Sequence, residues 1–159
     1  MSSAFEIIPF DPKFISHFER LNVAWLEEYF VVEPYDRLLL QNCKSEIIDK
    51  GGFIFFGQIN NAVVATVALL KTKEESVYEI GKMAVEKQYQ GKGYGSILLQ
   101  FLIDFSEKQN WKKLILYSST TLENSIYLYR KFGFLEIPME ENKPYQRGNI
   151  KMERALQSR

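Results

Sequence analysis

A glycine-rich stretch, Gln90-Gly91-Lys92-Gly93-Tyr94-Gly95-Ser96, has the residue types and spacing that point most directly to ligand chemistry. Glycine lacks a Cβ atom and tolerates positive φ, so a ligand can approach the backbone of such a loop closely. The preceding residues alternate as in a β-strand, and from Ile97 onward apolar residues recur as in a helix. The first turn of that helix leaves backbone N–H groups unpaired, which predicts an anion site suited to phosphate.

Three common phosphate-binding motifs do not fit this loop. A P-loop requires GxxxxGK[ST], which the chain does not contain. A dinucleotide fingerprint requires GxGxxG in the first turn of a βαβ unit, whereas the last glycine position is a serine here and the upstream segments are typical of hairpins. A protein-kinase glycine loop belongs to a far longer chain with further catalytic motifs. What remains is Gln/Arg-x-x-Gly-x-Gly, met by Gln90, Gly93 and Gly95 after a strand that ends Met83-Ala84-Val85.

This order of strand, loop and helix resembles the acetyl-CoA loop of the GNAT superfamily of N-acetyltransferases. The resemblance implies that a pantetheine arm pairs with the backbone of Met83, Ala84 and Val85, as an added strand would. It also implies that the pyrophosphate lies on the amides from Gln90 to Ser96, with Lys92 adding positive charge. The alternative for this loop is a structural turn whose glycines serve only tight packing.

LYRKFGF, residues 128–134, resembles a second signature of the family, LYxKxGF. The family places this tyrosine near the thioester sulfur, which implies that Tyr129 protonates the departing thiolate. A phenol pKa of about 10 and a thiol pKa of about 8.5 make that transfer feasible. The family's pantetheine-binding asparagine, seven residues before the tyrosine, is Leu122 here. Asn124 is a candidate ligand, although two residues rotate a helical side chain by roughly 200°, and Ser118 to Thr120 are alternatives.

Amine attack on a thioester requires a base, because a lysine-like amine has a pKa of about 10.4. Glu79 is the first candidate, since many relatives carry a glutamate at this point of the strand. It shares a face with Met83 and Val85 only if the strand has no bulge, and an ordinary solvent-facing glutamate is the alternative. Glu33, in the break between the first two predicted helices, is the second candidate. The aromatic residues around that break are Trp25, Tyr29, Phe30 and Tyr35.

The composition predicts a single domain over residues 1–159 whose core needs no metal or disulfide, since 46% of the residues are hydrophobic. Twenty basic and twenty acidic residues cancel, which argues against a nucleic-acid or membrane-surface partner. Without an apolar run of membrane-spanning length or a basic-apolar leader, we expect a cytoplasmic monomer or homodimer. One histidine, His17, and one cysteine, Cys43, do not suggest a metal site or a covalent enzyme intermediate.

The predicted elements follow the order β–α–α–β–β–β–α–β–α–β–β, with single helices expected over residues 13–30 and 35–50. The strands at 77–85 and 113–118 flank a helical crossover and are therefore expected to be parallel. The closing hairpin pairs 134–137 with 145–154. This predicts an α+β fold of three layers, with a mixed, mostly antiparallel sheet of about seven strands flanked by four helices, which is also the order of the GNAT fold.

The resemblance implies an acyl-CoA-dependent N-acyltransferase that moves acetyl from acetyl-CoA directly to a primary amine on a small molecule or peptide. A non-catalytic acyl-CoA-binding or regulatory module of the same fold is the main alternative. A nucleotide-binding domain that recognises ADP through the glycine loop is a further one. The sequence leaves open the acceptor, the length of the acyl group, the identity of the base and the oligomeric state.

Overall fold

The computed structural model describes residues 4–157, and within that range the strands form a seven-stranded sheet in the order β1-β2-β3-β4-β5-β7-β6. The strands are β1 (Glu6–Pro9), β2 (Phe53–Ile59), β3 (Ala62–Lys71), β4 (Val77–Val85), β5 (Lys113–Ser118), β6 (Leu135–Ile137) and β7 (Ile150–Ala155). Neighbouring strands are antiparallel except β4 and β5, which are parallel. The predicted mixed, mostly antiparallel sheet is confirmed.

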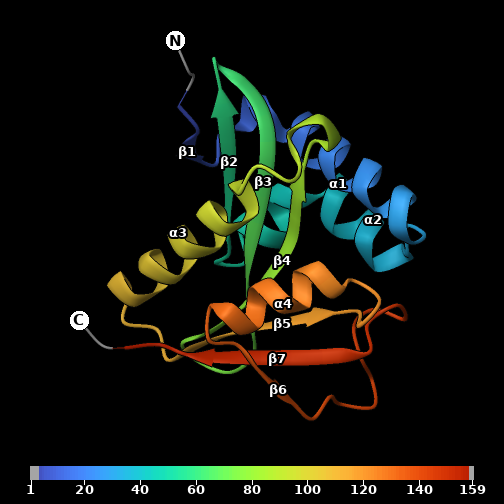
Figure 1. The fold of residues 1–159 in the computed structure, drawn as a ribbon, viewed down its shortest axis with the longest axis vertical. Helices are drawn as coiled ribbons and strands as arrows, with labels where there is room; N and C mark the ends of the chain where they lie inside the picture. Colours follow the sequence, from blue (N-terminus) through green and yellow to red (C-terminus); the bar gives the residue numbers. More distant parts are fainter. Residues whose placement is uncertain (1–3, 158–159) are drawn as a thin grey trace.

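Four α-helices lie on the two faces of this sheet in the part of the chain described (Figure 1). They are α1 (Ile15–Tyr29), α2 (Pro34–Gln41), α3 (Tyr94–Lys108) and α4 (Glu123–Lys131). α1 and α2 pack against one face, and α3 and α4 pack against the other, which gives the predicted three layers. Short 3-10 turns at Pro12–Phe14 (η1) and Lys87–Tyr89 (η3) precede α1 and the glycine loop. No helix between residues 4 and 157 is long and apolar enough to cross a membrane.

The single helix predicted over residues 35–50 is wrong, because two elements occupy this range. α2 ends at Gln41, and a π-helical turn (η2, Lys44–Ile48) follows. Asn42 leaves the helical backbone with ψ of 39°, and its side-chain amide donates to the carbonyl of Leu38 (3.3 Å). Asparagine side chains compete in this way with helical hydrogen bonding. The closing strand is also shorter than predicted, since β7 begins only at Ile150.

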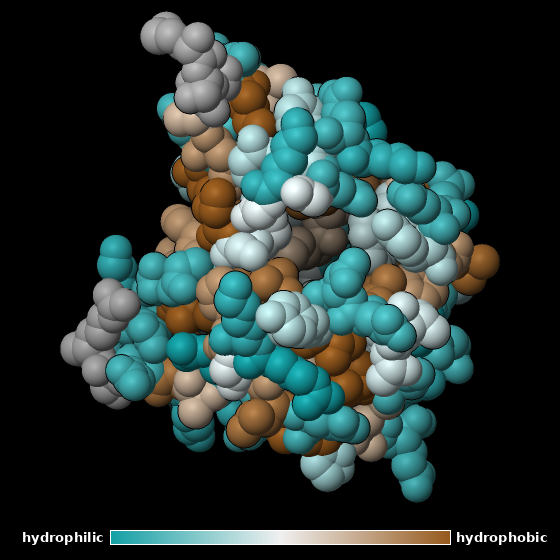
Figure 2. Space-filling model, viewed as in Figure 1, coloured by the Kyte–Doolittle hydropathy of each residue, from teal (hydrophilic) through white to brown (hydrophobic). Residues whose placement is uncertain are grey.

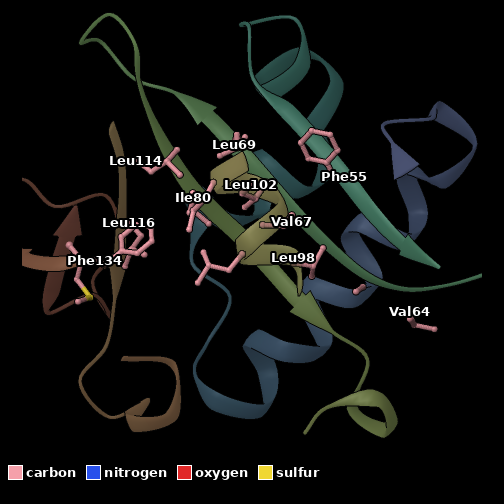
Figure 3. Packing of buried hydrophobic residues seen from close by; sticks show 14 of the residues in the cluster. Phe55, Val64, Val67, Leu69, Ile80, Leu98, Leu102, Leu114, Leu116 and Phe134 are labelled. Atoms are coloured by element: carbon pink, nitrogen blue, oxygen red, sulfur yellow. The ribbon is translucent and has the colours of Figure 1, made fainter. Parts of the chain in front are cut away.

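Two apolar clusters hold the three layers together. The larger one fills the space between the sheet and the α3–α4 layer, and Figure 3 shows its members from β2, β3, β4, α3 and β5 packed around Leu98 and Leu102. The second lies under α1 and α2 and includes Phe18, Leu40 and Phe56, all at most 2% exposed. Each such side chain contributes roughly 1.5–3 kcal/mol to folding. The sheet is therefore packed against apolar side chains on both faces.

β4 and β5 separate halfway along their length. Their pairing begins at Val77–Lys113 and ends at Ile80–Leu116, while β4 continues to Val85. β4 also contains a bulge, because Ala68 pairs with Gly81 and Thr66 with Ala84, so that two steps along β3 oppose three along β4. A bulge bends and twists its strand. The result is a gap between two parallel strands in the middle of the sheet.

Candidate active site

The gap between β4 and β5 opens into a cavity of about 570 Å³. Its walls come from α1, the end of β4, the glycine loop, the end of β5, the start of α4 and residues 145–148. Figure 2 shows the hollow between the part of the surface that carries α1 and the part that carries α4. Segments distant in sequence therefore meet around one space, and most of the residues predicted to form the site lie on its walls.

The glycine loop presents its backbone to this cavity. Gln90 fixes the loop to the end of β4, since its side-chain amide donates to the carbonyl of Val85 (2.9 Å). A Cβ atom on Gly91, Gly93 or Gly95 would meet no protein atom within 4 Å, so packing in the protein does not require these glycines. Gly91 and Gly93 have φ of 78° and 86°, a region that favours glycine.

The start of α3 leaves amides available beside the loop. The first amide of the helix with an internal partner is that of Ile97, which donates to the carbonyl of Gly93 (3.2 Å). The amides of the first turn before it are therefore available to a ligand. Open space next to free amides at a helix N-terminus fits a phosphate group. Lys92 and Ser96, which were also predicted to contact the pyrophosphate, are not among the residues that line the cavity.

The end of β4 contributes an unpaired strand edge. Met83 and Val85 line the cavity, whereas the side chain of Ala84 is buried in the cluster under α1 and α2. Because the ladder to β5 ends at Ile80, the backbone beyond it has no strand partner on this side. An extended ligand can pair with such an edge as an additional strand.

Tyr129 reaches the cavity from α4. Its ring packs edge-on against Phe134 with the centroids 6.0 Å apart. Burial raises the pKa of Tyr129 to about 12, so the hydroxyl remains protonated near neutral pH and can donate a hydrogen bond. Both Leu122 and Asn124 line the cavity near this point. So do Ser118, Ser119 and Thr121, with the hydroxyls of Ser119 and Thr121 bonded to each other at 2.8 Å.

Glu79 lines the cavity from the other face of the sheet. It pairs with Leu70, which belongs to the cluster under α1 and α2, whereas Met83 and Val85 pack toward α3. The bulge separates these residues, so Glu79 does not share a face with Met83. Burial raises the pKa of Glu79 to about 7, against the opposing charge of Lys82. A carboxyl group of this pKa can exchange a proton near neutral pH.

Glu33, the second predicted base, does not line the cavity. Its side chain takes part in the capping box at the start of α2 with Asp36. Its two carboxylate oxygens accept hydrogen bonds from the amides of Gln146 (2.8 Å) and Arg147 (3.2 Å) and from the Arg147 guanidinium (3.1 Å). Glu33 therefore ties the α1–α2 connection to residues 146–147, and of the two predicted bases only Glu79 lines the cavity.

A buried ion cluster, which the sequence analysis did not identify, lies beside Glu79. Asp36 is fully buried, and it accepts hydrogen bonds from Lys82 (2.5 Å) and, through both oxygens, from Arg147 (2.7 and 2.9 Å). Burial favours the neutral acid, but the Arg147 hydrogen bonds and the Lys82 charge hold the pKa of Asp36 below its ordinary value. The usable signal was a lysine in an otherwise apolar stretch of strand, which requires a buried partner.

His17 and Cys43 lie outside the cavity lining. His17 contacts the Arg20 guanidinium through Nδ1 (3.0 and 3.3 Å). Cys43 is buried in the cluster under α1 and α2, and burial raises the pKa of its thiol. A buried thiol of raised pKa is a poor nucleophile.

Residues 15–134 match the sequence model of the Acetyltransferase (GNAT) family. The chain is 27% identical over 95 residues to N-acetyltransferase 8B of Rattus norvegicus, covering 57% of this chain and 43% of that protein. It is 29% identical over 72 residues to Probable N-acetyltransferase 14 of Xenopus tropicalis, covering 45% of this chain and 35% of that protein. The chain thus spans less than half of the length of these curated relatives.

Solved structures support the same fold. A GNAT-family acetyltransferase from Staphylococcus aureus Mu50 superposes with a TM-score of 0.85 at 20% identity, covering 97% of this chain and 100% of that one. Spermidine N-acetyltransferase from Vibrio cholerae, solved with CoA and spermine, gives a TM-score of 0.72 at 18% identity and covers 95% of each chain. The fold of the solved relatives agrees with the family match, which covers residues 15–134. This chain therefore belongs to the GNAT acetyltransferase family.

Proposed function

We propose that this chain transfers an acetyl group from acetyl-CoA directly to a primary amine. The observation that carries the proposal is the end of the β4–β5 ladder at Ile80–Leu116 beside the glycine loop. One cavity thereby offers an unpaired strand edge for the pantetheine arm and free amides for the pyrophosphate. When bound, acetyl-CoA supplies the activated acetyl thioester.

The binding roles follow from the walls of the cavity. The amides from Gln90 to Ser96 would hold the pyrophosphate, and Lys92 would add charge from outside the lining. The backbone of Met83, Ala84 and Val85 would pair with the pantetheine arm. Asn124 borders the same part of the cavity as Leu122, so an amide two residues from the usual position is available to that arm.

The proposed proton transfers use Glu79 and Tyr129. The Glu79 carboxylate accepts a proton from the acceptor's ammonium group, and the neutral amine then attacks the thioester carbonyl carbon. As the C–S bond breaks, the sulfur receives a hydrogen bond from Tyr129. A phenol with a pKa of about 12 is a weaker acid than a thiol of about 8.5, so complete transfer would cost roughly 5 kcal/mol. Tyr129 therefore acts mainly as a hydrogen-bond donor, and the proton that remains on sulfur comes ultimately from the ammonium group.

Calorimetric titration tests the proposal with acetyl-CoA, CoA, ATP and NAD, followed by mass spectrometry of amines incubated with acetyl-CoA. We expect binding of both CoA species, no comparable binding of ATP or NAD, and an acetylated amine. At a hundredfold excess over its dissociation constant, acetyl-CoA should add about 2.7 kcal/mol to the stability. Absence of CoA binding would refute the proposal, and binding without transfer to any amine would identify a non-catalytic module.

A further inference from the structure

Aromatic side chains form one wall of the cavity, which we call the acceptor wall: Trp25 and Tyr29 of α1, Phe30 directly after the helix, and Tyr145. The Trp25 ring lies 5.2 Å from that of Tyr29 and 5.8 Å from that of Phe30, measured between centroids. Tyr29 is 43% exposed, so the acceptor wall reaches the surface. It lies on the α1 side of the sheet, which is also the face that carries Glu79.

The cations of this region are already neutralised. Besides tyrosines, the ionisable residues that line the cavity are Glu79, Lys82, Glu123 and Arg147. Lys82 and Arg147 both bind Asp36, and Arg147 also binds Glu33 at 3.1 Å. The two positive and two negative charges of this cluster cancel, and the Lys82 side chain is only 3% exposed. A carboxylate on the acceptor would therefore meet no uncompensated cation from these residues.

Glu79 is the charged group that remains available. It forms no salt bridge with any residue in the range 4–157, and its environment favours proton exchange near neutral pH. Glu123 lies on the exposed first turn of α4, on the opposite layer of the fold.

A polyamine could therefore pair only one of its ammonium groups with a carboxylate on this side of the cavity. Its other ammonium groups would lie against aromatic rings, which offer no negative charge. Lys82 and Arg147 already lie over the Tyr145 ring at 4.5 Å each, and Arg147 lies 5.9 Å from the Phe30 ring. These two rings therefore offer the acceptor apolar surface and no further cation site.

We propose that the acceptor is a small primary monoamine on an apolar or aromatic body, without a carboxylate group. The inference rests on the proposed function and adds the class of the acceptor to it. The ammonium group binds Glu79, and the apolar body lies against Trp25, Tyr29 and Phe30. A peptide is disfavoured because its backbone amides would face rings that offer them few hydrogen-bond partners.

The test compares matched amines at saturating acetyl-CoA. 2-Phenylethylamine represents the proposed class, phenylalanine adds a carboxylate to the same body, ethylamine removes the ring, and spermidine represents polyamines. We expect kcat/KM for 2-phenylethylamine to exceed that of each other amine at least about tenfold, the size of effect that burial of an aromatic ring supplies. Equal or faster acetylation of phenylalanine, spermidine or a tripeptide with an apolar N-terminus would overturn the proposal.

Variants of the acceptor wall separate its role from a structural one. Trp25→Ala should raise KM for 2-phenylethylamine about tenfold, while the Kd for acetyl-CoA stays within twofold. Tyr29→Ala, at a more exposed position, provides a second variant with less effect on folding. An unchanged KM in both folded variants would overturn the assignment. If acetyl-CoA binds but no amine of the panel is acetylated, only this inference fails, whereas failure of acetyl-CoA to bind refutes the proposed function as well.

Discussion

Gly95 offers the sharpest test of the proposed cofactor site, because a Cβ atom at this position would meet no protein atom within 4 Å. Gly95 is the second residue of α3. Alanine is favoured over glycine in a helix by up to about 1 kcal/mol. Gly95→Ala should therefore leave the stability of the free protein unchanged or raise it slightly.

The added methyl group should nevertheless weaken ligand binding. It would project into the cavity beside the free amides of the first turn of α3, where the proposal places the pyrophosphate. Loss of one hydrogen bond to a charged group costs about 1.5–3 kcal/mol. At 1.4 kcal/mol for each factor of ten, this predicts roughly 10- to 150-fold weaker binding of acetyl-CoA. Stability and affinity should thus change in opposite directions.

Isothermal titration with acetyl-CoA gives the affinity, and urea unfolding without ligand gives the stability. Gln100→Ala is the matched control, because Gln100 is exposed on the same helix and does not line the cavity. We expect its Kd for acetyl-CoA to equal that of the unmodified protein. An affinity within threefold for Gly95→Ala would refute the reasoning about the loop. Joint loss of stability and affinity would instead show that the glycine serves packing.

Four further predictions concern the proton transfers and the buried ion cluster. Tyr129→Phe removes the proposed hydrogen bond to the departing sulfur and should lower kcat by about 10²- to 10³-fold at unchanged acetyl-CoA Kd. Tyr127→Phe, 71% exposed on the same helix, should change neither quantity. As the pH increases, kcat/KM should rise with an apparent pKa of about 7, because Glu79 must be ionised to accept a proton. In Glu79→Gln, kcat/KM should no longer rise around pH 7. The folded state raises the pKa of Glu79, so protonated Glu79 stabilises the fold relative to the ionised form. This stabilisation is complete below about pH 4 and is lost as the pH rises through 7. Glu79→Gln should therefore unfold at a higher urea concentration than the unmodified protein at pH 8. Asp36→Asn should cost about 3–5 kcal/mol in urea unfolding, because it leaves the buried Lys82 without a carboxylate and leaves Arg147 with Glu33 alone. Lys82→Met should cost less, because Asp36 keeps its hydrogen bonds from Arg147, and the reverse order would contradict this assignment.

The order of elements could be predicted because each signal is local. The glycine loop lies between a strand and a helix, and Gly133 ends α4 as expected, with φ of 92°. The break after α2 was not predictable from periodicity, because Leu40 and Ile47 are both buried on either side of it. The spacing of apolar residues indicates which residues face the core. In this stretch, a continuous helix and an interrupted helix both bury the same apolar residues.

The buried ion cluster could not be predicted because its members come from distant parts of the sequence. Lys82 and Asp36 are 46 residues apart, and Arg147 and Asp36 are 111 residues apart. The sequence shows that Lys82 lies within an apolar strand, but it does not show which carboxylate neutralises it. The contact of Glu33 with Arg147, 114 residues away, is of the same long-range kind, and the position of Glu33 between two predicted helices does not reveal it.

The bulge in β4 determines how the proposed base and hydrogen-bond donor are arranged. In a regular strand, Glu79, Met83 and Val85 would share one face of the sheet. The extra residue at Lys82, where φ is 53°, reverses the alternation, so Glu79 faces the α1 side and Met83 faces the α3–α4 layer that carries Tyr129. In the proposed mechanism, an amine that approaches along the acceptor wall would lose its proton to Glu79 on one side of the gap. The sulfur would depart on the other side, where it would meet the Tyr129 hydroxyl. Because both residues line the same cavity, the parting of β4 and β5 at Ile80–Leu116 would let one acetyl group lie within reach of both.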